Sequence, residues 1–311
     1  MATRTPTPTQ STPQLSARGQ IALNRPPLLK CAVFENMYDA DTNPDGVINA
    51  YCRFVEKHNL HLIVDEIYAL STFTTLDNPS AQPFTSILSL SPLLEAGCQL
   101  SRIHCIYGSS KDWSSNGLRI GALISQGNEE VHKAMESSCI LMKISSAADV
   151  LWSGLLLDKV ALPEYIKLNQ ELLGKSYARA TSFLKTHSIP YRPSNAGHFI
   201  FIDLRRFLPT HDSAGKVLEN PLAQEEELAA AFVRSGILVA RGTVYCTDTP
   251  GWFRLTFTLR ADRFELALQR MEKCLGLYET TRVELVRRLS QESREREKIE
   301  EDGAKGEGVV V

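Results

Sequence analysis

The stretch "IYGSSKDWSSNGLRIGAL", residues 106–123, decides how the rest of the chain is interpreted. An apolar run typical of a buried strand ends in a Gly-Ser-Ser-Lys turn, and Arg119 follows Lys111 by eight residues. A lysine ammonium at the end of a buried strand costs free energy unless a partner neutralises it or a reaction uses it. We therefore ask which other residues would give Lys111 a chemical role.

The composition is that of an ordinary globular protein. Of the 311 residues, 43% are hydrophobic and 23% are charged, and the formal net charge is −2. This charge argues against a protein that grips nucleic acid or an anionic membrane. A helix that spans a bilayer needs a run of about 20 apolar residues, and no run in the sequence approaches this length. The first twenty residues lack the apolar central region of a secretory signal. The seven cysteines are scattered without a C-x-x-C pair, which is typical of the reducing cytosol. We expect a cytoplasmic protein without a metal site.

Segments of helical and strand periodicity alternate along the chain, which predicts an α/β layered fold. Residues 47–58 have helical spacing, a helix opens at Asn128, and residues 145–187 read as mainly helical with a new start at Pro163. On that last stretch Tyr165, Leu168, Leu172 and Leu173 are expected on one face. Further helices are expected over 222–236 and from about Asp262, and strands within 60–73, 101–110, 117–126, 198–207, 237–242 and 251–259.

Several polar residues stand out against this background. "VDEIY" places Asp65 and Tyr68 at the carboxyl end of a strand, the edge where open α/β sheets bind ligands. Taken alone, such an acid is more often a strand-end cap, and Arg119 could simply reach solvent. Arg254, in "WFRLTF", lies inside an apolar strand and needs an anionic partner.

Taken together, these residue types fit one chemistry. Pyridoxal phosphate needs a lysine for its Schiff base and a carboxylate that keeps its pyridine nitrogen protonated. It also needs a hydroxyl at the ring oxygen, with hydroxyls and cations for the phosphate. An amino-acid substrate needs an arginine, because only the guanidinium fork binds a carboxylate through two hydrogen bonds. The chain offers, in order, Asp65, Tyr68, Ser109 or Ser110, Lys111, Arg119 and Arg254.

Four segments carry a family resemblance: "AYCRFVEKHNLHLIVDEIYALSTF", "IYGSSKDWSSNGLRIGAL", "NAGHFIFIDLR" and "PGWFRLTFTL". With them the chain, over roughly residues 47–280, resembles the class I/II aminotransferases, which are fold-type I pyridoxal-phosphate enzymes. It is most similar to the 1-aminocyclopropane-1-carboxylate (ACC) synthase-like branch, which includes enzymes of fungal secondary metabolism. The resemblance implies a large domain with a mainly parallel sheet and helices on both faces, and a smaller C-terminal α+β domain.

The resemblance also implies a role for each candidate residue. Lys111 is similar to the lysine that forms the Schiff base and later moves the α-proton; burial and nearby cations would lower its pKa. Asp65 resembles the family's aspartate that binds the pyridine nitrogen. Tyr68 resembles the tyrosine that donates a hydrogen bond to the ring's phenolic oxygen.

The remaining candidates would bind the anionic groups. Ser110 and Arg119 resemble ligands of the cofactor phosphate, and Arg254 resembles the arginine that binds the substrate α-carboxylate. The family often has a serine three residues before the lysine, where this chain has Gly108. That part of the phosphate contact is therefore not expected.

The chain departs from the family pattern at its N-terminal side. Only 64 residues precede Asp65, whereas the family's large domain begins well over a hundred residues before the corresponding aspartate. We therefore expect an atypical or disordered segment at 1–42, an incomplete large domain at 43–165, a small domain at 166–280 and a charged tail at 281–311. The turn that cradles the phosphate and the aromatic side chain that stacks on the ring would be missing.

Three functions follow from the resemblance. The first is an aminotransferase-like or ACC synthase-like enzyme that acts at the α-carbon of a small amino acid. The second is a carbon–sulfur lyase of the same branch, and the third is a catalytically impaired relative that serves only as a dimer partner. Fold-type I enzymes place each active site at a dimer interface, so the resemblance also implies a homodimer.

Overall fold

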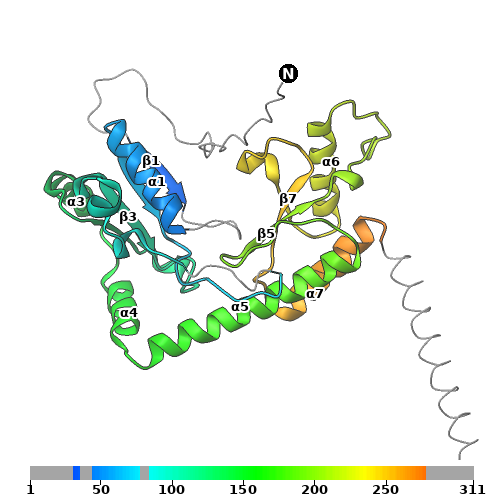
Figure 1. Cartoon of the computed structure of the whole chain (residues 1–311). Coiled ribbons are helices and arrows are strands. Elements are labelled where there is room, and N and C mark those ends of the chain that lie inside the picture. The colour runs from blue at the N-terminus through cyan, green and yellow to red at the C-terminus, as the bar shows by residue number, and fades with distance from the viewer. Residues whose placement is uncertain (1–30, 36–43, 78–83, 278–311) are drawn as a thin grey trace, which may run out of the picture. The chain divides into compact units, whose positions relative to one another are not determined.

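The computed structural model describes residues 31–35, 44–77 and 84–277 (Figure 1). They form two compact units: one holds the described residues up to Arg179 together with Arg192–Ile200, and the other holds Ala180–Tyr191 and the described residues from Phe201 onward. Apart from 31–35, the predicted segments 1–42 and 281–311 lie outside the described residues. The predicted domain limits stay a prediction.

The first unit is built on a four-stranded sheet. Its strands are β1 (Cys31–Glu35), β2 (His61–Asp65), β3 (Ile103–Gly108) and β4 (Gly121–Ser125), in the order β1-β2-β3-β4. The pairs β1–β2 and β2–β3 are parallel and β3–β4 is antiparallel, so the predicted mainly parallel sheet is confirmed. Asp65 is opposite Ile106 in this register. The carboxyl ends of β2 and β3 therefore lie side by side.

The helices of the first unit differ in burial: α1 (Pro44–Lys57) packs one face into the core, whereas α3 (Glu129–Leu141) has no buried residue. Helix α1 lies alongside the sheet (Figure 1), and short α2 (Pro92–Ala96) follows the second strand. The core contains Ile48 and Val55 of α1 with Leu62 and Val64 of β2, all fully buried. Helices α3 and α4 (Ser146–Leu157) come after β4. The predicted start of α3 is confirmed, because Asn128 accepts a hydrogen bond from the Val131 N–H at 3.0 Å.

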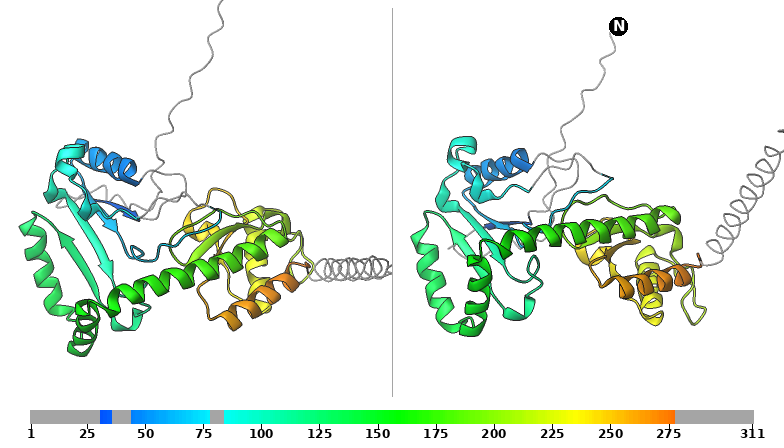
Figure 2. Two further views of the ribbon diagram at one scale, coloured as in Figure 1. Left: turned by 60° about the horizontal axis from the view of Figure 1, so that its bottom comes forward. Right: turned by 90° about the horizontal axis from the view of Figure 1, so that it is seen from below.

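Helix α5 (Ala161–Thr186) is one unbroken helix in both views of Figure 2. Its buried side chains include Leu173, Tyr177 and Leu184, spaced by four and seven residues and hence on one face. The predicted face was wrong for Leu168 and Leu172, which are 55% and 50% exposed. Their spacing from Leu173 and Tyr177 turns them away from the buried face.

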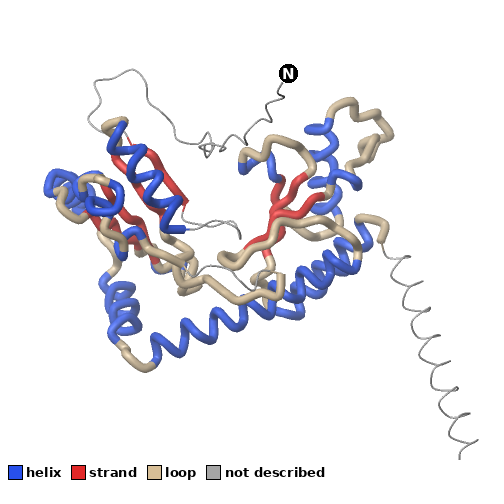
Figure 3. Tube along the Cα trace, viewed as in Figure 1, coloured by secondary structure: helices blue, strands red, loops and turns tan. Residues whose placement is uncertain are grey.

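The second unit combines a small sheet with helices α6 and α7 and the C-terminal end of α5 (Figure 3). Strands β5 (Phe199–Asp203), β7 (Trp252–Thr256) and β6 (Ala240–Arg241) are adjacent in that order, with β6 and β7 antiparallel. Helix α6 (Pro221–Arg234) starts at the N-cap Asn220, and α7 (Ala261–Cys274) ends the described elements. Phe232, Phe253 and Leu268 are buried in its core. Short 3-10 helices occupy connections: η1 (Ile87–Ser89), η2 (Leu100–Arg102), η3 (Asn116–Leu118), η4 (Arg205–Phe207) and η5 (Gly242–Tyr245).

The described cysteine side chains differ sharply in exposure. Cys52 and Cys98 are fully buried, whereas Cys139 and Cys246 are exposed. Burial raises the pKa of the Cys52 thiol to about 12 and that of Cys98 to about 11.

Within the described ranges, no helix is both long and apolar enough to cross a bilayer. The same residues include no cluster of three or more His, Cys, Asp or Glu suited to a metal ion.

Candidate active site

Asp65 is the last residue of β2 and is half-buried. Its Oδ1 accepts a hydrogen bond from the Ile67 N–H at 3.1 Å, a local turn that short acidic side chains favour. The turn bends the chain directly after the strand and carries Tyr68 in the following residues. The sequence prediction that Asp65 lies at the carboxyl end of a strand is confirmed.

Lys111 lies in the turn that follows β3. Its Nζ is 5.8 Å from the centroid of the Tyr68 ring, within the range of a cation–π contact. The two residues are 43 positions apart in the sequence, and the parallel pairing of β2 with β3 brings them together. The predicted burial of Lys111 was wrong: its side chain is exposed, and the neighbours Ser109 and Asp112 are the buried residues of this turn.

Gly108 ends β3 where two strands approach closely. A Cβ at this position would lie 2.9 Å from the Ile120 carbonyl oxygen and 3.3 Å from Ile67 Cδ1. Such contacts are too close for an ordinary side chain. The serine that the family often has here therefore has no room in this chain.

The two predicted phosphate ligands lie in the same connection as Lys111. Ser110 is half-buried, and Arg119 is exposed and follows η3. Arg119 has a left-handed backbone with φ of 57°, and its guanidinium donates to the Asn116 carbonyl at 3.0 Å. Both side chains are thus placed in the first unit, with Asp65, Tyr68 and Lys111.

Arg254 belongs to the second unit, in the middle of β7, and is half-buried. Its guanidinium carbon lies 4.1 Å from the centroid of the Tyr245 ring. The Tyr245 ring in turn meets Phe201 edge-on, with centroids 6.0 Å apart. Sequence reasoning missed Tyr245; the available signal was an aromatic residue in the connection just before the arginine-bearing strand.

Sequence reasoning also missed Asp112, which directly follows Lys111. It is 1% exposed, and its carboxylate accepts hydrogen bonds from the Leu70 N–H and the Tyr107 hydroxyl, both at 3.0 Å, and from the Ser71 hydroxyl at 2.5 Å. Burial raises the pKa of Asp112, and the donors oppose that shift. The signal was an acid next to the lysine in "SSKDW".

His198 is the third missed residue. Its Nε2 lies 3.3 Å from Ser71 Oγ, and its ring meets the Tyr68 ring edge-on with centroids 5.2 Å apart. Burial, followed by the nearby Lys111 charge, lowers the His198 pKa. The imidazole is therefore held towards its neutral form.

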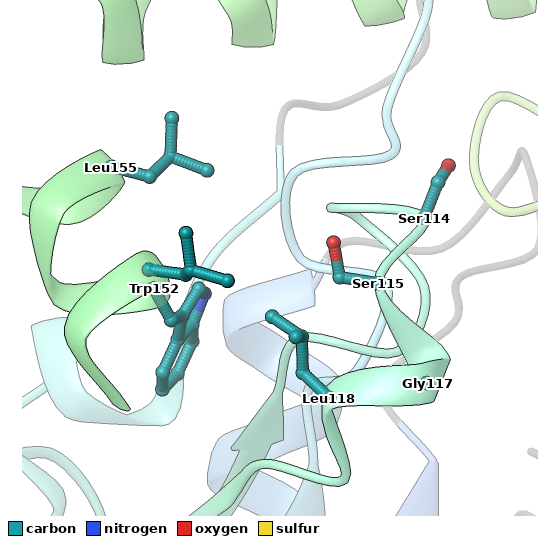
Figure 4. A pocket seen from close by; sticks show the side chains of 7 residues that line it. Ser114, Ser115, Gly117, Leu118, Trp152 and Leu155 are labelled. Atoms are coloured by element: carbon teal, nitrogen blue, oxygen red, sulfur yellow. The ribbon is translucent and has the colours of Figure 1, made fainter. Parts of the chain in front are cut away.

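A cavity of about 430 Å³ lies beside the lysine-bearing turn (Figure 4). In Figure 4 Trp152 and Leu155 of α4 lie across from Leu118 of η3. Trp152 Nε1 is a buried donor that has no hydrogen-bond partner among the described residues. The lining residues are Ser114, Ser115, Gly117, Leu118, Leu151, Trp152 and Leu155.

The candidate cofactor-binding side chains of the first unit differ in charge. They are the Asp65 carboxylate, the Lys111 ammonium, the Tyr68 phenol, the Arg119 guanidinium and the Ser110 hydroxyl. These groups fit the pyridine nitrogen, aldehyde, ring oxygen and phosphate of pyridoxal phosphate.

A family model described as aminotransferase class I and II matches residues 42–271. The chain belongs to this family. It is 36% identical over 235 residues to "Probable aminotransferase aclI" of Aspergillus oryzae. The aligned residues cover 75% of this chain and 53% of that protein. It is 33% identical over 260 residues to "Probable inactive 1-aminocyclopropane-1-carboxylate synthase-like protein 2" of Homo sapiens, covering 81% of this chain and 41% of that protein.

The fold agrees with the family. The aromatic aminotransferase of Pyrococcus horikoshii superposes with a TM-score of 0.63 at 16% identity, covering 80% of this chain and 61% of that chain. The predicted fold-type I architecture is therefore confirmed. This aminotransferase-family chain spans about half the length of the curated relatives it matches.

Proposed function

We propose that the chain is a pyridoxal-phosphate-dependent enzyme that acts at the α-carbon of a small amino acid, as an aminotransferase-like or ACC synthase-like member of its family. The observation that carries the proposal is the Lys111 Nζ lying 5.8 Å from the Tyr68 ring centroid, with Asp65 at the end of the adjacent strand. The similarity to the probable aminotransferase of Aspergillus oryzae supports it.

When bound, pyridoxal phosphate supplies an electron sink for the negative charge that develops at the substrate's α-carbon. Within the first unit, the Asp65 carboxylate would bind the protonated ring nitrogen and the Tyr68 hydroxyl would bind the ring oxygen. Ser110 and Arg119 would bind the phosphate. The Lys111 amine would hold the aldehyde group until the substrate's amino group takes its place, and the freed Nζ would then carry the proton from the substrate's α-carbon.

Arg254 would bind the substrate's α-carboxylate. Its guanidinium lies against the Tyr245 ring, which limits rotation of the plane. An arginine held this way keeps its N–H fork in one orientation, as two parallel hydrogen bonds to a carboxylate require. The substrate class is therefore an α-amino acid with a free carboxylate.

Two other functions remain candidates. A carbon–sulfur lyase of the same branch would use the same residues, and its product would be a thiol rather than a new amino acid. The alternative that this chain is itself catalytically impaired is supported by its similarity to the human protein, which is named as probably inactive. A place in fungal secondary metabolism is supported by the resemblance to that branch and by the similarity to the Aspergillus oryzae protein.

We also propose that the chain forms a homodimer through helices α3 and α4. Leu141 is 87% exposed, Met142 71%, Val150 70% and Leu157 78%. Clustered apolar side chains of this kind mark interaction surfaces in soluble proteins.

The first experiment is reduction of the purified chain with borohydride in the presence of pyridoxal phosphate, followed by peptide mass spectrometry. We expect a phosphopyridoxyl group on Lys111, absent from Lys111→Ala and retained in the control Lys143→Ala, an exposed lysine of the same unit. Persistence of specific labelling in Lys111→Ala would contradict the lysine assignment. Absence of labelling in the unmodified chain would favour the impaired relative.

A second experiment separates substrate binding from cofactor binding. Arg254→Ala should weaken amino-acid binding by about tenfold or more, the effect of a lost charge-assisted hydrogen-bond pair, and leave labelling of Lys111 unchanged. Arg260→Ala, which removes an exposed ion pair with Asp262, serves as the control. Both reactions release a 2-oxo acid, so the transferase is identified by the amino acid formed from an added 2-oxo acid, and the lyase by a free thiol and ammonia released from a cysteine thioether.

A further inference from the structure

The turn that carries Tyr68 is joined to the segment that carries His198 by backbone hydrogen bonds. The Phe73 N–H donates to the Asn195 carbonyl at 2.8 Å, and the Gly197 N–H donates to the Ser71 carbonyl at 2.9 Å. Thr72 and Ala196 form an isolated antiparallel bridge between them. His198 therefore has a fixed backbone position next to Ser71.

Ser71 is fully buried, and its hydroxyl has one proton to give. That proton is directed to Asp112 Oδ1, 2.5 Å away, because an ionised carboxylate only accepts hydrogen bonds. Ser71 Oγ is then the acceptor in its 3.3 Å contact with His198 Nε2. The His198 proton consequently lies on Nε2 in the neutral imidazole.

The His198 ring holds Tyr68 from one side. Its plane is at 83° to the Tyr68 ring, and the neighbouring Phe199 ring is at 88° to it with centroids 5.9 Å apart. The Lys111 ammonium approaches the same tyrosine ring. Because Asp112 is bonded to Lys111, the contacts close a circuit: Lys111, Asp112, Ser71, His198 and Tyr68.

We propose that Ser71 is a positioning residue of the cofactor site, which links Asp112 to His198 and thereby fixes Tyr68 against Lys111. The identity of the cofactor rests on the proposed function, but the link itself does not. Removing the hydroxyl takes one donor from the buried Asp112 carboxylate and the acceptor from His198 Nε2–H. Both losses loosen the two ends of the circuit that hold Tyr68 and Lys111.

The chain offers a matched control. The Ser86 hydroxyl donates to Glu66 Oε2 at 2.7 Å, and Glu66 is 4% exposed. Ser86→Ala thus removes a serine–carboxylate hydrogen bond in the same unit without touching Asp112 or His198. Differences between Ser71→Ala and Ser86→Ala report on the circuit rather than on the loss of one buried hydrogen bond.

The test has two readouts. Labelling of Lys111 by pyridoxal phosphate and borohydride should require about tenfold more cofactor in Ser71→Ala than in the unmodified chain, which is the effect of a lost hydrogen bond to a charged group. Ser86→Ala should require about the same amount as the unmodified chain. Nitrogen-15 NMR of the imidazoles, above the histidine pKa, should show the Nε2–H form of His198 in the unmodified chain and in Ser86→Ala. In Ser71→Ala it should show a mixture of both tautomers.

Each outcome decides one question. Equal labelling of Ser71→Ala and the unmodified chain, or equal loss in both serine variants, overturns the positioning role. An Nδ1–H form of His198 in the unmodified chain also overturns it, and this measurement needs no variant to fold. If the unmodified chain fails to label at all, the proposed function is wrong, and the tautomer of His198 still tests the link.

Discussion

Gly108 shows how a single position limits what the lysine turn can contain. Gly108→Ser would place a Cβ 2.9 Å from the Ile120 carbonyl oxygen, so the strands must shift. We expect the free energy of unfolding to fall by about 1–3 kcal/mol, as for overpacked cores, in denaturant titrations. Gly117→Ala is the control, because a Cβ added there would have nothing within 4 Å. An unchanged stability of Gly108→Ser would show that β3 and β4 separate easily.

The residues that the sequence could identify are those whose role depends on local pattern. Asp65 and Lys111 follow apolar runs, and the ends of strands are visible in periodicity. Asp112 and His198 could not be identified in this way, because their partner Ser71 is 41 and 127 positions away in the sequence. The exposure of Lys111 was equally hidden, since only the folded turn decides which of its residues points inward.

At the scale of elements, α3 depends on its N-cap residue, Asn128. Besides accepting from the Val131 N–H, Asn128 donates to the Ser101 carbonyl at 2.7 Å. Asn128→Ala should lower the free energy of unfolding by about 1 kcal/mol or more. The comparison is Asn220→Ala at the start of α6, where the side-chain oxygen accepts from the Ala223 N–H at 2.8 Å. A smaller loss at Asn128 than at Asn220 would contradict a contribution from the Ser101 contact.

A histidine pair links three strands of the first sheet and should make the unit sensitive to acid. His104 is 2% exposed; its Nε2 lies 2.8 Å from His61 Nδ1 and its Nδ1 lies 2.8 Å from Ser125 Oγ. Burial, then the charges of His61 and His132, lowers the His104 pKa from 6.5 to about 4. The unfolded chain therefore binds the proton first as the pH falls.

The consequence is a pH-dependent stability with a defined sign. The contribution of His104 is complete above about pH 6.5 and is lost as the pH falls towards about 4, with a loss of up to about 3 kcal/mol. Urea titrations between these pH values should show a smaller pH dependence for His104→Gln than for the unmodified chain. His211→Gln, at an exposed histidine of the second unit, should behave like the unmodified chain. An equal pH dependence in His104→Gln would place the acid sensitivity elsewhere.

Element boundaries were predictable where a cap or glycine marks them and less so elsewhere. Asn128 marked α3, and Gly236, with φ of 74°, follows the end of α6 as predicted. The strand expected over 237–242 is reduced to the two residues of β6. Periodicity over so short an apolar run cannot separate a paired strand from an extended connection.

For the molecule as a whole, the apolar surface of α3 and α4 predicts self-association. Leu151 and Leu157 are 64% and 78% exposed, and glutamate at both positions should lower the average mass seen by sedimentation at a given concentration. Leu238→Glu is the control, because Leu238 is 87% exposed in the second unit. An unchanged sedimentation profile of Leu151→Glu/Leu157→Glu would exclude this surface as the dimer interface.

The fold class was predictable because motifs in four segments occurred in family order, and the parallel pairing of β2 with β3 then follows from the α/β pattern. The line between the compact units was not predictable, because it crosses the uninterrupted helix α5 at Arg179. No loop, glycine or change in composition marks that position.

The contrast among the cysteines makes the chain suited to site-selective labelling. Thiol reagents react with the thiolate, so Cys52 and Cys98, with burial and raised pKa values, should remain unmodified at neutral pH. Cys139 lies on α3 and Cys246 directly follows η5, both exposed. Each compact unit thus already carries an attachment point for a spin label or a fluorophore. With Cys31 and Cys274 replaced by serine, one doubly labelled molecule would report on both units while cofactor and amino acid are added.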